Sequence, residues 1–248
     1  MASTTEKREE WITVPRKGRR NPKTAISYSS HDNFSRPNPP SSSSLSASDI
    51  EKEHQRIAAQ WEASSSCRQL QEIVASRASS RCSISNAICL GLGSFDPEND
   101  SWDSKRKSHV QLAAFLCMVE QLQRSSPHKI PCLFQEPVFN SSDKSFIQSL
   151  GHEVVESPEA FDRVTPSTLV FGVHLYKSIY VQAIAKHLPA VFVGTPLDVW
   201  EEFHHDFSKD WAAMTELDKQ SDKVTFPEDT GYSTFSSTVI YWGRQDEP

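Results

Sequence analysis

The sequence contains no long hydrophobic run. None of its 248 residues lies in a stretch approaching the roughly 18 consecutive apolar residues of a membrane-spanning helix. The first ten residues are polar and charged, and they lack the apolar core of a secretory signal. We therefore expect no membrane insertion and a location in the cytoplasm, the nucleus or both.

Cysteine pairs at metal-binding spacing are missing as well. The sequence has five cysteines but no CxxC pair, which excludes a zinc ribbon built on thiolates. Five is an odd number, and Cys89, Cys117 and Cys132 lie inside apolar runs. Reduced thiols in a protein core explain this pattern better than a disulfide framework, which again favours the cytosol or nucleus.

Positive charge is concentrated at the N-terminus. Residues 1–36 carry eight Lys or Arg and four Asp or Glu, a net charge of +4, and because the whole chain carries −6 the remainder carries −10. An acidic body is a poor surface for nucleic acids, so we expect no specific nucleic-acid binding. Non-specific contacts with phosphates would be confined to the basic cluster at Arg16–Arg20.

The N-terminal region divides into two parts. Residues 1–47 are rich in serine and proline with few large apolar side chains, which predicts a disordered basic arm. Residues 48–83 are predicted to be an amphipathic helix over 48–76 followed by a linker. Ser48 and Glu51 have capping-box spacing, and an apolar face is formed by Ile57, Trp61, Leu70, Ile73 and Val74.

Residues 84–243 alternate apolar runs of strand length with helical patterns. Strands are expected at 86–92, 131–135, 152–156, 168–173, 190–194 and 237–242, and helices at 105–124, 142–150, 176–187 and within 197–218. Continuous apolar strands separated by helices indicate a parallel sheet covered on both faces. We predict a three-layer open α/β domain of Rossmann-like type, with strand order 3-2-1-4-5 and an additional C-terminal strand.

Polar and glycine residues follow three of these strands. Gly91, Gly93 and Ser94 follow the first strand, Glu136 the second and His174 the fourth. In the predicted order these three carboxyl ends are neighbours, and open parallel sheets bind ligands at that edge. The sequence therefore predicts a ligand-binding site formed by these five residues.

The residue types suit a small ligand, but they also suit ordinary turns. Gly91 and Gly93 allow a close approach of the backbone, Glu136 could accept a hydrogen bond from a ribose hydroxyl, and His174 could exchange a proton near neutral pH. Against this, the third glycine position of a GxGxxG signature is Asp96, and glycines at strand ends are commonly only turns.

The segment after the glycines is acidic. Its acids are Asp96, Glu98, Asp100 and Asp103, and they precede the basic run 105–107. Four acids repel an anionic phosphate unless the basic run folds over them. They also fit a purely structural role, because acids near the start of a helix favour its dipole.

Other patterns are weaker. The HExxE run at 152–156 lacks the second histidine of a metalloprotease and lies on a predicted strand. Glu201 and His205 could share one helix face, but a solvated face explains them better than a metal site. Ser94 is not in a GxSxG elbow, and Cys89 and Cys117 are predicted to be buried and inert. No metal site and no catalytic pair are predicted.

Several runs together resemble the sensitivity-to-red-light-reduced (SRR1-like) domain family. They are Ile88–Phe95, Ser108 with Gln111–Ala113, Gln135–Phe139, Thr168–Phe171 with His174, and Trp11–Val14 with Arg16–Arg19. The family usually has Met-Pro-His-Cys where this chain has Gly172–Leu175, and Gly-Asn-Ser where it has Gly194–Pro196. Only the histidine of the first motif is retained, so family chemistry that uses the cysteine or the asparagine would be altered here.

The resemblance implies a regulatory role. Such proteins are linked to circadian and light signalling in plants, and elsewhere to regulation of haem synthesis, clock expression or growth related to the cytoskeleton. No established reaction comes with the family, so we expect a non-catalytic regulator that binds a protein or a small ligand. The alternative is an enzyme of methyltransferase type that binds a nucleotide or S-adenosylmethionine. The sequence identifies neither the cofactor nor the partner.

Overall fold

The structure is a computed structural model that describes residues 45–78, 83–99, 101–203, 212–229 and 231–244. The arm predicted over 1–47 lies outside the described residues except for its last three. Of the linker predicted over 77–83, the structure describes residues 77, 78 and 83.

The chain enters the described domain through α1 (Ala47–Glu62). The hydroxyl of Ser46 accepts a hydrogen bond from the main-chain N–H of Asp49 at 3.2 Å, so Ser46 is the N-cap. The capping-box spacing at Ser48 had placed the start two residues later. Both serines have an acidic residue three positions on, and the sequence pattern does not choose between them.

The single helix expected over 48–76 is divided in the structure. A second helix, α2 (Ser65–Ala78), starts after a break at residues 63–64. The hydroxyl of Ser64 accepts a hydrogen bond from the main-chain N–H of Cys67 at 3.2 Å. The serines at 64–66 therefore lie where one helix ends and the next is capped.

Seven strands form one sheet in the order β3-β2-β1-β4-β5-β7-β6. The strands are β1 (Asn86–Leu90), β2 (Cys132–Gln135), β3 (Glu153–Val154), β4 (Thr168–Phe171), β5 (Val191–Gly194), β6 (Ser221–Thr225) and β7 (Val239–Gly243). The first five pair in parallel, β7 is antiparallel to β5, and β6 is antiparallel to β7. This confirms the α/β class and the order 3-2-1-4-5 followed by a C-terminal strand.

The sheet has one strand that the sequence reading did not predict. β6 pairs only with β7 and therefore forms an edge of the sheet. Asp222 and Lys223 in its centre are exposed, so the strand has no apolar run. Charged edge strands of this kind protect a sheet from pairing with a further strand. They have no apolar run, so a sequence pattern for buried strands does not detect them.

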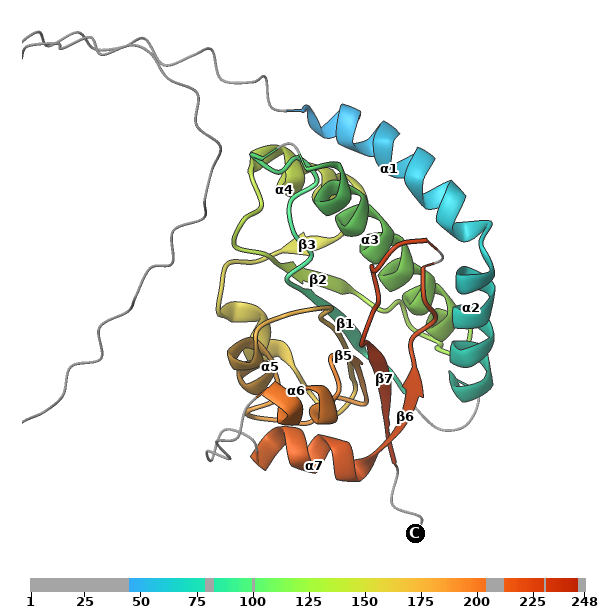
Figure 1. The fold of residues 1–248 in the computed structure, drawn as a ribbon, viewed down its shortest axis with the longest axis vertical. Coiled ribbons are helices and arrows are strands. Elements are labelled where there is room, and N and C mark those ends of the chain that lie inside the picture. The colour runs from blue at the N-terminus through green and yellow to red at the C-terminus, as the bar shows by residue number, and fades with distance from the viewer. Residues whose placement is uncertain (1–44, 79–82, 100, 204–211, 230, 245–248) are drawn as a thin grey trace, which may run out of the picture. The chain divides into compact units, whose positions relative to one another are not determined.

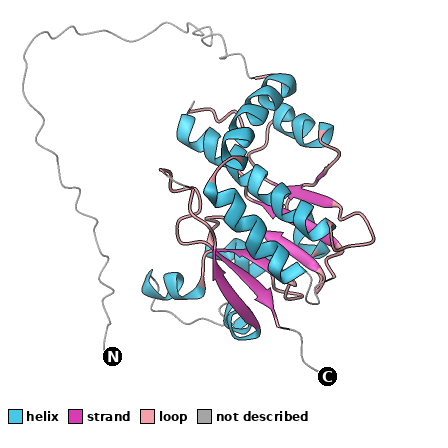
Figure 2. Ribbon diagram, turned by 90° about the vertical axis from the view of Figure 1, so that its right-hand side faces the viewer, coloured by secondary structure: helices cyan, strands magenta, loops and turns pink. Residues whose placement is uncertain are grey.

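The remaining helices lie in the connections between the strands. They are α3 (Trp102–Gln123), α4 (Ser141–Ser149), the short η1 (Glu159–Arg163), α5 (Lys177–Ala183), α6 (Leu197–Phe203) and α7 (Ala212–Gln220). Figures 1 and 2 show the strands between two groups of helices, with α1–α4 on one side and α5–α7 on the other. α1 and α2 pack against α3, and α1 also contacts α4.

Alternate residues of the inner strands β1, β2, β4, β5 and β7 lie in two separate cores. In β1, Ala87 and Cys89 join the core under α1–α4, whereas Ile88 and Leu90 join the core under η1, α5 and α7. Both faces of the parallel strands are therefore buried, which explains why their sequences are continuous apolar runs. None of the helices in the described part of the chain combines the length and the apolar character that crossing a bilayer requires.

Candidate functional site

The three predicted strand ends lie side by side. β1 pairs with β2 on one side and with β4 on the other, so the residues that follow these strands share the carboxyl edge of the sheet. The main-chain N–H of Gly91 still donates to the carbonyl oxygen of Gln135 at 3.1 Å, which extends the β1–β2 pairing by one bond. The topology thus places all five predicted site residues on one edge.

Gly93 and Glu136 are in direct contact at this edge. The main-chain N–H of Gly93 donates to Oε2 of Glu136 at 2.7 Å, and the N–H of Val138 donates to Oε1 at 3.0 Å. Both carboxylate oxygens therefore accept from the backbone of loops that leave neighbouring strands. Gly93 has φ +81°, a conformation that glycine adopts without strain.

Gly91 lies beneath a side chain from the end of β4. It has φ +64°, and a Cβ built on it would be 2.0 Å from Cδ2 of Leu175. The absence of a side chain at Gly91 therefore makes room for Leu175. This space is filled by packing within the chain.

Ser94 is bound to an acid that the sequence reading did not select. Its hydroxyl donates to Oδ2 of Asp143 at 2.7 Å, while the N–H groups of Phe95 and Asn140 donate to the same carboxylate at 3.1 and 3.0 Å. Asp143 is fully buried, and burial raises the pKa of its carboxyl although these hydrogen bonds lower it. The Asn140 and Asp143 spacing is a capping-box signal that could have located the start of α4, but not the contact with Ser94.

His174 binds a different segment at the carboxyl edge. It is exposed and has φ +56°, and its Nε2 lies 2.7 Å from the carbonyl oxygen of Ser236. Because a carbonyl oxygen only accepts, Nε2 carries the proton in this contact. The imidazole thus binds the connection between β6 and β7.

That connection, residues 226–238, lies at the carboxyl edge and is held by several elements. Arg106 of α3 binds Asp229 with N–O distances of 2.6 and 3.3 Å, and its guanidinium lies 3.4 Å from the ring centroid of Tyr232. Ser66 of α2 donates a hydrogen bond to the carbonyl oxygen of Glu228. In Figure 1 the red connection extends from the two strands toward α3.

Two hollows open at this edge, and each is lined in part by one of the predicted site residues. A groove of about 540 Å³ is lined by the loop 94–99, including Ser94, together with Val138 and Asn140. A shallower hollow of about 280 Å³ is lined by His174, Leu175, Thr195, Val199, Trp200, Ser236 and Ser237. Neither hollow is lined by Gly91, Gly93 or Glu136. These residues instead support the loops that lie between the two hollows.

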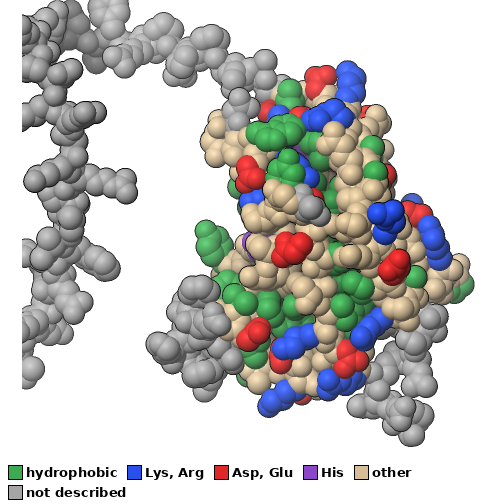
Figure 3. All heavy atoms as spheres, turned by 45° about the vertical axis from the view of Figure 1, so that its right-hand side comes forward, with side chains coloured by type: hydrophobic (Ala, Val, Ile, Leu, Met, Phe, Trp, Pro, Cys, Tyr) green, Lys and Arg blue, Asp and Glu red, His purple; other side chains and the backbone are tan. Residues whose placement is uncertain are grey.

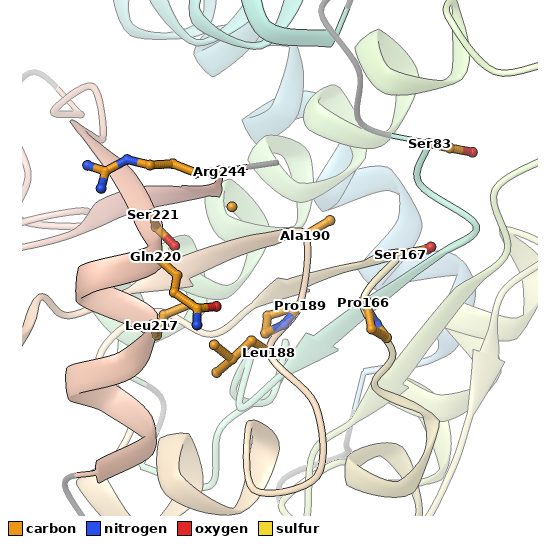
Figure 4. A pocket seen from close by; sticks show the side chains of 11 residues that line it. Ser83, Pro166, Ser167, Leu188, Pro189, Ala190, Leu217, Gln220, Ser221 and Arg244 are labelled. Carbon is orange, nitrogen blue, oxygen red and sulfur yellow. The ribbon is translucent and has the colours of Figure 1, made fainter. Parts of the chain in front are cut away.

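A third cavity, of about 350 Å³, lies at the opposite edge, where the parallel strands begin (Figure 4). Its lining includes Leu188, Pro189, Leu217 and Gln220, and Arg244 is its one charged residue. In Figure 4 the Arg244 side chain extends away from the cavity, and its guanidinium donates to Asp222 and to the carbonyl oxygen of Lys219. The cavity therefore presents no free charge to a ligand.

Buried thiols and histidines add no reactive centre. The four described cysteines are buried, and burial raises the pKa of Cys117 to about 12 and of Cys132 to about 11. Burial also lowers the pKa of His152 at the start of the HExxE run. Within the described ranges no three His, Cys, Asp or Glu side chains form a group that could hold a metal. His204 and His205 lie outside those ranges.

The exposed surface carries charges of both signs. On the face in Figure 3, Lys and Arg side chains are interspersed with Asp and Glu, with small apolar areas between them. A nucleic-acid surface usually gathers its basic side chains into one patch or stripe. The described part of this face has no such stripe.

Comparison with known proteins identifies a family. The family model for the SRR1 domain matches residues 66–242. No curated protein matches the chain. Among solved structures, the chain is similar to the crystal structure of Thermoplasma acidophilum 1320, at 9% sequence identity and a TM-score of 0.33, over 65% of this chain and 75% of that one. That likeness is too low to carry an argument about function.

Proposed function

Because the chain belongs to the SRR1 domain family, we propose that it is a non-catalytic regulatory protein that acts by binding at the carboxyl edge of its sheet. The family implies a role in circadian or light signalling, or in regulation such as that of haem synthesis. We carry that role over to this chain as part of the proposal, together with a cytoplasmic or nuclear location.

One observation carries the proposal. The polar side chains predicted for the site are engaged by the chain's own groups: Glu136 by two backbone N–H groups, Ser94 by Asp143, and His174 by the carbonyl oxygen of Ser236. Of these side chains, Ser94 has a carboxylate base within hydrogen-bond reach, but the same carboxylate also accepts the N–H groups of Phe95 and Asn140 and so ties the loop after β1 to the start of α4. The contacts thus shape the loops, which suits a surface for binding.

The departures from the family motifs support the same reading. Leu175, at the position where the family usually has cysteine, fills the space above Gly91. Thr195, at the position of the usual asparagine, has its N–H and hydroxyl within 3.1 and 3.3 Å of the hydroxyl of Tyr180. Packing and internal hydrogen bonds therefore occupy the two positions at which the family motif has reactive or polar side chains.

The competing function is an enzyme that binds a nucleotide or S-adenosylmethionine. What favours it is the contact between Gly93 and Glu136, because an acid after the second strand is where such ligands place a ribose hydroxyl. Binding there would require Glu136 to release a backbone partner or to use a remaining lone pair.

Thermal denaturation with a panel of nucleotides and S-adenosylmethionine distinguishes the two functions. A ligand at 100 times its dissociation constant adds about 2.7 kcal/mol to the free energy of unfolding. We expect no compound of the panel to raise the melting temperature. If one compound does so, and Glu136→Gln removes the effect while Glu72→Gln on the surface of α2 does not, the enzyme is the better explanation.

The basic N-terminal segment offers a way to regulate the proposed binding. Residues 1–36 carry a net charge of +4, and serines are frequent from residue 1 to 47. Each phosphate adds about −1.5 to −2 charges, so two or three would neutralise the segment. We propose that phosphorylation of the serine cluster 41–44, which follows this segment, offsets its positive charge and tunes the binding of partners; phosphate-mimicking Ser→Asp variants at 41–44 would test this by a change in partner affinity.

A further inference from the structure

The exposed large apolar side chains gather at one edge of the domain. In the described chain they are Trp102, Val138, Tyr176 and Tyr232, with exposures of 49%, 63%, 83% and 45%. They belong to segments that follow β1, β2, β4 and β6 respectively, and these segments all lie at the carboxyl edge. None of the four lies at the opposite edge. Apolar side chains concentrated in this way mark an interaction surface.

Within this edge, the groove beside Val138 combines apolar and acidic groups. One wall is the loop 94–99 with Pro97, Asp96 and Glu98, and the other is formed by Val138 and Asn140. Glu98 and Val138 are exposed, and both border the same volume of about 540 Å³. A ligand in the groove would meet apolar surface and negative charge together.

Among the described residues, no basic side chain neutralises the negative charge of the groove. The cations in the first turns of the two helices that follow its walls are each paired elsewhere: Lys105 with Glu53, Arg106 with Asp229, Lys107 with Asp103, and Lys144 with Glu156. No Lys or Arg of the described residues forms an ion pair with Asp96 or Glu98. Oδ2 of Asp96 accepts the main-chain N–H of Leu45 at 2.8 Å.

A third acid lies next to the groove. Asp143 is buried and binds Ser94 of the lining, and the charge of Asp96 adds to the effect of burial in raising the pKa of Asp143. Three acids therefore lie in or beside the groove. Such a groove disfavours anionic ligands such as nucleotides and nucleic acids, and it attracts cationic groups.

We propose that this groove docks a basic segment of a partner protein, with an arginine or lysine beside Asp96 and Glu98 and an apolar side chain on Val138. The inference rests on the proposed function as a binding protein and states the chemistry of its partner. The groove is lined by seven residues, against roughly 20–30 residues a side in stable complexes, so a single segment binds weakly and reversibly. That strength suits a regulatory contact.

The test uses the full-length protein and a fluorescein-labelled synthetic dodecapeptide in which arginine and lysine alternate with leucine and phenylalanine. Fluorescence anisotropy measures its dissociation constant at low and at moderate salt. A peptide with glutamate in place of each arginine and lysine is the matched probe. We expect the basic peptide to bind with a dissociation constant in the micromolar range, weakening with salt, and the acidic peptide not to bind.

Charge and apolar variants then locate the binding. Glu98→Lys should weaken binding of the basic peptide by about tenfold, because attraction is replaced by repulsion, and Val138→Ser by about threefold to fivefold. Glu72→Lys changes the net charge by the same amount on exposed α2 and should leave binding unchanged. Both groove residues are exposed, so unfolding midpoints should stay the same and exclude misfolding as the cause.

Three results would overturn the assignment: no binding of the basic peptide, equal weakening by Glu72→Lys and Glu98→Lys, or a dimer of the wild-type protein that Val138→Ser dissociates. The last would assign the groove to a second copy of the chain. Each of these leaves the proposed regulatory function standing. A compound-specific thermal shift that depends on Glu136 would instead overturn that function and leave the groove assignment intact.

Discussion

The carboxylate of Glu136 accepts the main-chain N–H of Gly93 at 2.7 Å and so ties the loop after β1 to the loop after β2. Its second oxygen holds the N–H of Val138 at 3.0 Å and thereby positions one wall of the acidic groove. The acid at the end of the second strand is thus a structural link between two loops. Its removal should be measurable as a loss of stability.

Replacing Glu136 with alanine is expected to lower the free energy of unfolding by about 1–3 kcal/mol, because two backbone N–H groups lose an ionised acceptor. Urea denaturation measures the loss. Glu136→Gln keeps one accepting oxygen and should lose less. Glu72→Ala, on an exposed helix surface, is the control and should change little. Equal stability of Glu136→Ala and wild type would show that the link contributes nothing.

Gly91→Ala should be more destabilising than Gly151→Ala. Both glycines have positive φ, +64° and +83°, so each alanine costs about 1–2 kcal/mol of backbone strain. At Gly91 the new Cβ also meets Leu175 at 2.0 Å, whereas at Gly151 nothing lies within 4 Å. The clash should add about 1–3 kcal/mol. Combining Gly91→Ala with Leu175→Ala should recover the clash component, and a double-mutant cycle that finds no coupling would contradict the packing described here.

Asp229→Ala should cost about 3–5 kcal/mol, because it leaves the buried guanidinium of Arg106 without its partner. Hydrogen exchange should increase in the connection 226–238, which this ion pair holds against α3. Asp162→Ala breaks an exposed pair with Lys186 and should cost less than about 1 kcal/mol. Similar losses in both variants would show that the Arg106 pair is no more important than a surface contact.

The buried pair His54 and His109 should make the protein sensitive to acid. Their Nδ1 atoms lie 3.3 Å apart, and burial lowers the pKa of His54 to about 4 and of His109 to about 3. The charges of His54, Lys105 and Arg56 contribute, after burial, to this lowering of the pKa of His109. The unfolded chain therefore binds protons below about pH 6.5 that the folded protein does not bind.

Stability should accordingly fall as the pH decreases from about 6.5 to 4, by up to about 1.4 kcal/mol per pH unit for each histidine. Denaturant unfolding at several pH values measures this slope. His109→Phe should reduce the slope by about half, and His128→Asn, at an exposed loop, should leave it unchanged. An unchanged slope in His109→Phe would exclude this pair as the cause.

Much of the fold could be predicted because each buried strand has a distinct sequence pattern. β1 and β4 are continuous apolar runs, and helices between such runs require parallel crossovers. β6 lacked this signal because its centre is exposed and charged. The division of the first helix depended on the Ser64 hydroxyl, which caps α2 instead of facing solvent within a longer helix.

The site was predicted less completely than the fold. Strand order brought Gly93 and Glu136 together, as sequence position and topology implied. The partner of His174 could not be predicted because Ser236 lies 62 residues away in a connection whose first strand was missed. Asp143 was missed for a related reason: its capping-box spacing is local, but its contact with Ser94 spans 49 residues.

By itself the sequence determined which segments become the buried strands and that both of their faces are covered, because continuous apolar runs express burial locally. Only the tertiary structure decided which polar atoms meet at the carboxyl edge and which remain open to a partner. Hydrogen bonding is short-ranged and directional, so a difference of a few ångströms between loops decides whether a carboxylate binds its own backbone, as Glu136 does, or faces a groove, as Glu98 does.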